Sequence, residues 1–362
     1  MARSYNANIM GSVLALLLLS LTGDLAAQKS DEHAIAARFA PVFIQALGDD
    51  ERSDYVTNFD FDGDWRGDNN WENAGNAEFP LRAFIYYAVS ETETHHFLHY
   101  AVFHPRDYKG GVQQGRFLSE LMRQGAKIVG GRDPTGLLKH ASAAHENDME
   151  GALVVVEKNE TAADARVVFV ETLAHNTFSR YASGHFGVEG EKPKLYIEPR
   201  GHGIEGDIRD SERSGQEKFL IYRFSGQAEN PETTGSQSIG YELLPLKSTL
   251  WPKAVGLTRK KNATYGSTHD YADVSIKVLS AKGASTIRKV KLGGLGSAFL
   301  GTAGSESMAR PPWGWFDSKR QGDPLGLWFF DPATIIKRDF DLGESFSTTY
   351  IRVPFWAGKP VK

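Results

Sequence analysis

Short runs in which apolar residues alternate with polar ones recur along most of the chain. They are rich in Val, Ile, Tyr and Phe and are separated by turn residues, a pattern typical of β-strands. The predicted strands are 83–89, 97–103, 152–157, 167–172, 195–198, 218–224, 274–279, 286–292 and 348–353. Many short strands with turns between them favour packed layers of sheet. We therefore predict a mainly β protein, a β-sandwich with a few inserted helices and long loops.

Helical periodicity is confined to a few segments. Residues 31–47 begin with acidic side chains and then show helical apolar spacing, which Pro41 interrupts. This pattern predicts a short helix with a strand-like or helical continuation. Further helical turns are predicted over 115–124 and near 331–338. The stretch from residue 48 to 80 is rich in Asp, Asn, Gly and Trp, which predicts a long loop.

The N-terminus has the pattern of a secretory signal peptide. An apolar run over 13–21 is followed by the small residues of Leu25-Ala26-Ala27 and then by a polar stretch. The alternative is a retained membrane anchor, which needs about 20 apolar residues, and this run is shorter. We predict a cleaved signal over 1–27 and a secreted or periplasmic protein. Residues 28–362 are predicted to form one large domain, with a polar loop or weak boundary at 225–238.

Composition excludes several function classes. The chain has 41 Lys plus Arg against 45 Asp plus Glu, for a net charge of -4, and no long basic run, which argues against a nucleic-acid partner. It has no cysteine, so disulfides, thiolate metal sites and a cysteine nucleophile are excluded. Imidazole and carboxylate groups are then the ligands available for a metal. The fingerprints of serine hydrolases, P-loops and dinucleotide sites are absent from the sequence.

A run of imidazole and carboxylate groups precedes the strand predicted over 152–157. It is not the zinc-protease pattern HExxH, because Met149 occupies the position of the second His and the following run is strand-like. Asp148 and Glu150 are two apart and point to one face of a strand, where His145 can join them from the preceding loop. Together they predict a site for Ca²⁺, Mg²⁺, Mn²⁺ or Zn²⁺ rather than copper. The alternative is an exposed acidic turn before a core strand.

A second acidic segment lies in the loop between residues 48 and 80. Asp60, Asp62 and Asp64 alternate along the chain, and Gly63 lets it turn, a spacing that resembles oxygen ligands around Ca²⁺. The segment is not an EF-hand, because Trp71 stands where the bidentate Glu would be. Two interpretations stay open: these Asp residues contribute to a metal site, or they cap backbone N–H groups in an Asx-rich turn.

Nine of the 11 histidines fall between residues 95 and 202. Alternation places His95 and His99 on one face of the strand over 97–103 and its flanks, and His96 and His104 on the other. Either face is a cleft or part of the core, and a single His in an apolar strand is more often a core residue than a ligand. His104, at the strand end, is the best candidate among them.

Two further histidines are candidates from loops. Glycines on both sides of His202 let the backbone approach a ligand, although an exposed glycine-rich turn gives the same pattern. His175 follows the strand over 167–172, from which it can reach the same cleft as Glu150. We take His104, His175 and His202 as candidate general acids or bases.

The run His145-x-x-Asp148-x-Glu150 resembles the motif of the vacuolar protein sorting-associated protein 62 family, where His-x-x-Asp-Trp-Glu precedes a strand. It is also similar to the Gly-His-Arg-His-Asp-Trp-Glu heptapeptide of the necrosis- and ethylene-inducing peptide-like proteins, with Asn147 and Met149 at the second His and the Trp. The resemblance implies a secreted β-sandwich that holds a divalent cation at a glycolipid-binding, membrane-damaging surface. It implies a metal role for the three motif residues, supplemented by an Asp of the loop 60–64.

Two function classes follow. In the first, the cation bridges the protein to an anionic, glycan or lipid head group, with peripheral membrane contact and without cutting a bond. In the second, the metal activates water for hydrolysis of a phosphodiester, glycoside or ester, and a nearby His serves as general acid or base. The resemblance favours binding and the surplus of histidines favours catalysis. We take head-group binding as the first prediction and hydrolysis as the alternative.

Overall fold

The computed structural model describes residues 31–107, 121, 125, 144–159, 164–206, 218–257, 262–280, 283–301 and 309–355. The predicted signal peptide over 1–27 lies outside the described residues, as does most of the helix predicted over 115–124. Within these ranges, no helix is long and apolar enough to cross a membrane.

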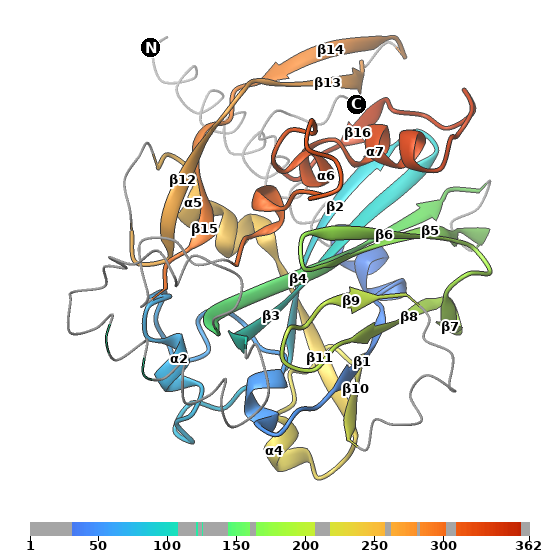
Figure 1. The fold of residues 1–362 in the computed structure, drawn as a ribbon. Helices are drawn as coiled ribbons and strands as arrows, with labels where there is room; N and C mark the ends of the chain where they lie inside the picture. Colours follow the sequence, from blue (N-terminus) through green and yellow to red (C-terminus); the bar gives the residue numbers. More distant parts are fainter. Residues whose placement is uncertain are drawn as a thin grey trace, which may run out of the picture.

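One mixed sheet of 14 strands forms the body of the described structure (Figure 1). The strands of its main path are β1 (Val42–Ala46), β2 (Phe84–Thr92), β3 (His95–Asp107), β4 (His145–Glu157), β5 (Arg166–Ala174), β6 (Thr177–Ala182), β7 (Gly187–Glu189), β8 (Lys192–Ile197), β10 (Phe219–Phe224) and β11 (Ser238–Pro245). They lie side by side in the order β6-β5-β4-β3-β2-β11-β10-β1-β8-β7.

The remaining strands extend this sheet or stand beside it. β9 (Ile204–Glu205) pairs with β8, and β16 (Tyr350–Arg352) pairs with β2. The hairpin of β13 (Val274–Leu279) and β14 (Ser285–Val290) is joined to the sheet through β16 and forms the long ribbon at the top of Figure 1. β12 (Tyr265–Tyr271) and β15 (Gly293–Phe299) form a separate two-stranded sheet.

The large sheet curls back on itself. β8 and β9 lie near one end of the strand order, yet they contact β5 near the other end, and β9 also contacts β4. Large buried aromatic side chains fill the core, among them Phe43, Tyr86, Tyr100 and Tyr241. The predicted mainly β architecture is confirmed, and its body is one large, curled mixed sheet.

All nine predicted strands are present, but the two at the motif are longer than predicted. β3 and β4 each have 13 residues and pair in an antiparallel register that runs from His95↔Glu157 to Asp107↔His145. The polar residues at the start of β4 predicted a loop. In the structure, pairing with β3 holds them in the strand. His145 therefore belongs to the strand, whereas a preceding loop was predicted. Both faces of β3 are largely buried, so neither is an open cleft.

The helical segments are short. Residues 31–38 are helical and β1 follows after Pro41, as predicted, and the turn predicted near 331–338 is α7 (Pro332–Asp339). The others are η1 (Glu51–Asp54), α2 (Asn70–Asn73), α4 (Pro231–Thr234), η4 (Leu246–Ser248), α5 (Leu250–Ala254), η5 (Pro312–Gly314) and α6 (Leu327–Phe330). The polar segment 225–238 contains α4 and connects β10 to its parallel neighbour β11 within the same sheet.

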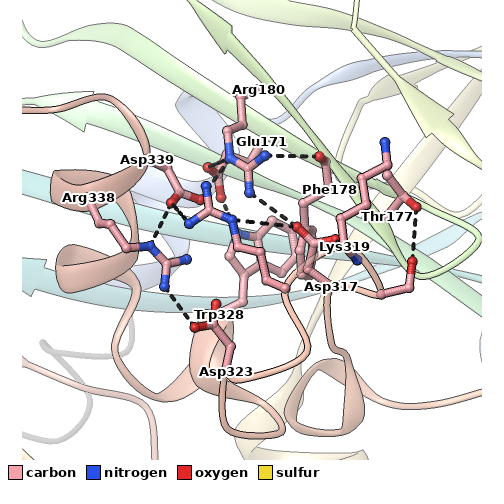
Figure 2. Close-up of polar contacts among 12 residues, drawn as sticks. Glu171, Thr177, Phe178, Arg180, Asp317, Lys319, Asp323, Trp328, Arg338 and Asp339 are labelled. Carbon is pink, nitrogen blue, oxygen red and sulfur yellow. Dashed lines mark hydrogen bonds and ion pairs between the residues drawn. The ribbon is translucent and has the colours of Figure 1, made fainter.

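An ion-pair network fastens the C-terminal segment to β5 and β6 (Figure 2). Nε of Arg180 lies 2.8 Å from Oδ2 of Asp339 and 3.4 Å from Oε1 of Glu171, and its Nη2 lies 3.2 Å from Oδ2 of Asp317. Nε1 of Trp328 donates to Oε2 of Glu171 over 2.7 Å. The network joins residues far apart in sequence, so it holds the segment after residue 309 against the sheet.

Glu171 is fully buried in this network, and its environment favours the protonated acid. Burial, and then the negative charge of Asp339, raise the pKa of Glu171 to about 8. The charge balance agrees, because Glu171, Asp317, Asp323 and Asp339 face the three guanidinium groups of Arg180, Arg320 and Arg338. If one of the four carboxyl groups is protonated, the net charge of the seven side chains is zero.

We expect this proton to give the folded protein a measurable pH dependence. Because the pKa of Glu171 is raised from 4.5 to about 8, its contribution to stability is fully present below pH 4.5 and is lost as the pH rises through about 8. Glu171→Gln is a neutral isostere that still accepts from Trp328, so it should flatten the decline in the free energy of unfolding between these pH values. Urea unfolding across that range measures the difference.

The matched control is Glu189→Gln, whose carboxylate is paired with Arg223 at the surface. Burial lowers the pKa of His95 to about 4, which gives an opposite trend below pH 6.5, but this trend is common to all variants and cancels in the comparison. Parallel pH curves for the wild type and Glu171→Gln would contradict a protonated Glu171.

Candidate functional site

The motif residues lie where the end of β3 meets the start of β4. The register pairs Asp107 with His145, His104 with Asp148 and Val102 with Glu150. Strict alternation would place His145 and Asp148 on opposite faces. Asn147 between them has a φ of 65°, which interrupts the pleat. Ligand atoms of Asp107, His145 and Asp148 accordingly lie within 4.8 Å of one another.

Buried hydrogen bonds hold Asn147 in this conformation. Its Nδ2 donates to the carbonyl oxygens of Gly67 and Leu300, both over 2.7 Å, and its Oδ1 accepts from Nδ2 of Asn70 over 2.6 Å. The side chain thus ties the loop before α2 and the end of β15 to β4. The backbone turn that gathers the motif residues is fixed by tertiary contacts.

A small polar pocket of about 40 Å³ opens beside these residues. Asp107, His145 and Glu150 line it from β3 and β4, and His175 and Arg310 line it from neighbouring loops. Nε2 of His145 lies 3.2 Å from Oδ2 of Asp107. The backbone N–H of His175 donates to Oε1 of Glu150 over 3.2 Å. Two carboxylates, two imidazoles and one guanidinium therefore converge on a space large enough for a few water-sized groups.

Asp148 is oriented from the buried side by His202. Nδ1 of His202 lies 2.9 Å from Oδ2 of Asp148, and its Nε2 lies 3.1 Å from Oδ1 of Asp54. Burial opposes the charging of His202, but the hydrogen bonds and charges of the two aspartates outweigh it and raise its pKa to about 10. Asp54 also accepts from the backbone N–H groups of Gly48 and Arg200. An imidazolium between two carboxylates thus supports the floor of the site.

His104 stacks on His202 and stays neutral. Their ring centroids are 3.7 Å apart and the rings are nearly parallel, at 7°. Gln45 donates through its amide to the carbonyl oxygens of Ala46 and Glu198, so its Oε1 accepts from Nε2 of His104 over 2.9 Å. Burial and the charge of His202 lower the pKa of His104 well below its usual value. Both rings are fully buried and neither lines the polar pocket.

Backbone strain is concentrated around the site. Among the described residues other than glycine, positive φ angles occur at Asn147, His175, Asn176, Arg200, His202 and Asp341, and all except Asp341 belong to segments at the site. Such angles cost free energy and persist where surrounding contacts enforce them. The glycines beside His202 have a steric role, since a Cβ on Gly201 would lie 2.6 Å from the His175 ring.

The loop 60–64 makes local contacts of the Asx-turn kind. Oδ1 of Asp62 accepts from the backbone N–H of Asp64, Oδ1 of Asp64 accepts from that of Arg66, and Oδ1 of Asp60 accepts from Nδ2 of Asn58. None of the three belongs to a group of ligand atoms within 4.8 Å in the described ranges. The metal role predicted for them stays a prediction without geometric support.

The structure brings most of the predicted site residues into one region. His145, Glu150 and His175 line the pocket, Asp148 lies within 4.8 Å of ligand atoms of Asp107 and His145, and His104 and His202 lie behind Asp148. Sequence reasoning missed Asp107, Asp54 and Arg310 as members of the site. Asp107 carried a partial signal, because it lies shortly after the strand predicted over 97–103, whereas the other two come from loops whose packing no local pattern indicates.

No protein-family model matches the chain, and no match is found among curated proteins. Among solved structures, one described as a toxin fold for microbial attack and plant defense is 13% identical and covers 48% of this chain and 67% of its own, with a TM-score of 0.27. NLPPya in complex with glucosamine is 13% identical, with 59% of this chain and 72% of its own covered, at a TM-score of 0.29.

Necrosis and ethylene inducing protein 2, from the causal agent of cocoa's witches' broom disease, is 18% identical, with 35% of this chain and 48% of its own covered, at a TM-score of 0.22. At these TM-scores the likeness does not assign the chain to a family or a function. Neither a family model nor these structures support the resemblance to the vacuolar protein sorting-associated protein 62 family.

Proposed function

We propose that this protein binds a divalent cation through Asp107, His145, Asp148 and Glu150 and uses it to hold an anionic or sugar head group without cutting a bond. The observation that carries this proposal is the convergence of Asp107, His145 and Asp148, whose ligand atoms lie within 4.8 Å of one another; Asp107 and His145 also line the polar pocket. Like-charged carboxylates are costly to hold this close unless a cation or proton offsets their charge.

The donor set fits a hard or borderline cation. Carboxylate oxygens suit Ca²⁺, Mg²⁺ and Mn²⁺, and the imidazole of His145 is also a ligand for Mn²⁺ and Zn²⁺. One oxygen of Asp148 is occupied by His202, and its other oxygen has no hydrogen bond to the described residues. The salt-bridged aspartate therefore keeps a free ligand atom, as carboxylates oriented by outer hydrogen bonds do in metal sites.

The pocket also offers a group suited to an anionic ligand. Arg310 lines it beside the carboxylates, and a guanidinium pairs with phosphate or carboxylate through two parallel hydrogen bonds. A ligand held by the cation on one side and by Arg310 on the other would carry negative charge, as phosphorylated or carboxylated head groups do. Where that head group belongs to a lipid, the protein would make peripheral contact with a membrane after export and removal of residues 1–27.

A hydrolase is the second candidate, and it rests on His175. Nε2 of this half-exposed residue lies 3.0 Å from Oε2 of Glu198, the arrangement in which a carboxylate orients a general base. His104 and His202 are fully buried, which suits support of Asp148 better than proton exchange with a substrate. Chelator-sensitive cleavage of a phosphodiester, ester or glycoside that is lost in His175→Asn would favour hydrolysis.

Isothermal titration with Ca²⁺, Mg²⁺ and Mn²⁺ tests the cation site. We expect Asp107→Asn and Glu150→Gln each to lower the affinity for the preferred cation by at least about ten-fold, because each removes a charged ligand. Asp62→Asn is the matched control, since its carboxylate caps the loop and does not line the pocket. Unchanged affinity in both pocket variants, or an equal loss in the control, would contradict the proposed site.

A further inference from the structure

A second and larger pocket, of about 320 Å³, lies where β3 begins, β4 ends and β5 begins, opposite the segment after α7. His95 and Asp107 stand at the two ends of β3, roughly 40 Å apart at the rise of an extended strand. This pocket is therefore remote from the cation site. Its volume is at the lower end of the range for small-molecule sites.

A buried imidazole with one unused nitrogen lines this pocket. His95 is 7% exposed, and its Nδ1 lies 2.8 Å from Oγ1 of Thr94. That hydroxyl accepts from the backbone N–H of Ser347 over 3.1 Å, which leaves its proton for Nδ1 of His95. Nε2 then carries the ring proton, and it has no hydrogen-bond partner among the described residues. Because burial lowers the pKa of His95 to about 4, the ring is a neutral N–H donor.

The rim of the pocket carries two cationic side chains, and each is paired with one carboxylate. Lys158 and Arg166 contribute two cations and Glu157 one carboxylate. Nζ of Lys158 is held by Oε1 of Glu91 at 2.6 Å, so it is fixed in place. The Arg166 side chain is 71% exposed and contacts Glu157 through Nε and Nη2 only, which leaves Nη1 free to donate. Nη1 of Arg166 can therefore donate to one carboxylate of a ligand, while Glu157 beside it opposes a second negative charge.

The opposite wall is apolar. The ring of Phe346 packs against that of His95 with centroids 4.3 Å apart, and it is itself buried. Val168, Phe169 and Leu342 line the same space and are only half-buried. Their exposed apolar surface would be covered by a ligand with a hydrocarbon or aromatic body, which is favourable in proportion to the area removed from water.

We propose that this pocket is a second binding site, for a small monocarboxylate with an aromatic or branched apolar body. The body packs on Phe346, Phe169 and Leu342, and the carboxylate accepts hydrogen bonds from Nε2 of His95 and the guanidinium of Arg166. The site needs no metal and is independent of the head-group function proposed above.

Ligand-observed NMR and calorimetry with three probes, benzoate, phenylacetate and 3-methylbutanoate, test this site in the full chain. We expect at least one probe to bind saturably, with and without chelator, and the neutral isostere benzamide to bind at least about ten-fold more weakly than benzoate. Val168→Trp fills the pocket from a half-buried strand position and should abolish binding. Arg166→Gln should weaken it several-fold, while Arg223→Gln, which breaks a comparable surface pair with Glu189, should not.

Three results would overturn the proposal: no saturable binding of any probe up to about 10 mM, equal affinity for benzoate and benzamide, or binding that survives in Val168→Trp. Circular dichroism and a thermal unfolding curve for each variant separate loss of binding from loss of folding. Should Val168→Trp not fold, Ser345→Trp blocks the pocket from its exposed opposite side and gives the same test.

Discussion

His202→Asn is expected to lower the free energy of unfolding by about 3–5 kcal/mol at pH 7, because it leaves Asp54 and Asp148 buried without the imidazolium that pairs them. Asn tolerates the left-handed backbone conformation, where His202 has a φ of 51°, so the change isolates the side chain from backbone strain. Chemical unfolding of the wild type and the variant measures this difference.

His185→Asn is the matched control for this variant. His185 is exposed in a turn, so its replacement should change stability by no more than about 0.5 kcal/mol. Adding Asp54→Asn to His202→Asn removes one of the two stranded charges and should recover part of the loss. A cost below about 1 kcal/mol for His202→Asn would show that the buried aspartates do not depend on the imidazolium.

Arg180→Met is expected to cost about 3 kcal/mol or more, because the guanidinium contacts Asp339, Asp317 and Glu171, whose side chains are at most 4% exposed. Methionine retains much of the apolar stem of arginine, so the lost stabilisation is mainly that of the ion pairs. Denaturant unfolding followed by tryptophan fluorescence measures the cost, since Trp328 lies within the network.

Arg223→Met serves as its control. It breaks the pair with Glu189, whose side chains are 37% and 44% exposed, and should cost less than about 1 kcal/mol. Combining Arg180→Met with Glu171→Gln should give a cost unequal to the sum of the two, because the residues share one network. Additive effects, or equal costs for Arg180→Met and Arg223→Met, would contradict the role assigned to the network.

Local patterns found nine of the described strands and a strand-like segment at β1, but missed β6, β7, β9, β11, β12 and β15 and gave no strand order. Alternation identified all nine predicted strands, since each depends on its own residues and turns. The parallel pairs β1–β8 and β11–β2 join segments far apart in the chain, and no local pattern indicates them. The lengths of β3 and β4 were underestimated for the same reason. The polar residues at the start of β4 are held in the strand by β3, which is separated from β4 in the chain by residues 108–144.

The site was predictable only in its local part. The spacing of His145, Asp148 and Glu150 indicated a cation site before the fold was considered. Asp107 joins it through the β3–β4 register, and Asn147 gathers the residues through a positive φ that Asn tolerates but does not require. His202 reaches Asp148 from the segment between β8 and β9, so its role as an internal counter-charge depends on the curl of the sheet.

Anomalous diffraction from crystals soaked in Mn²⁺ tests the cation site most directly. We predict one peak beside the polar pocket, within about 2.0–2.6 Å of carboxylate oxygens of Asp107 and Asp148 and beside His145. The peak should vanish in Asp107→Asn and persist in Asp62→Asn. A peak in the loop 60–64, or crystals that show no peak at the pocket, would contradict the proposal that this protein acts through a divalent cation held at the start of β4.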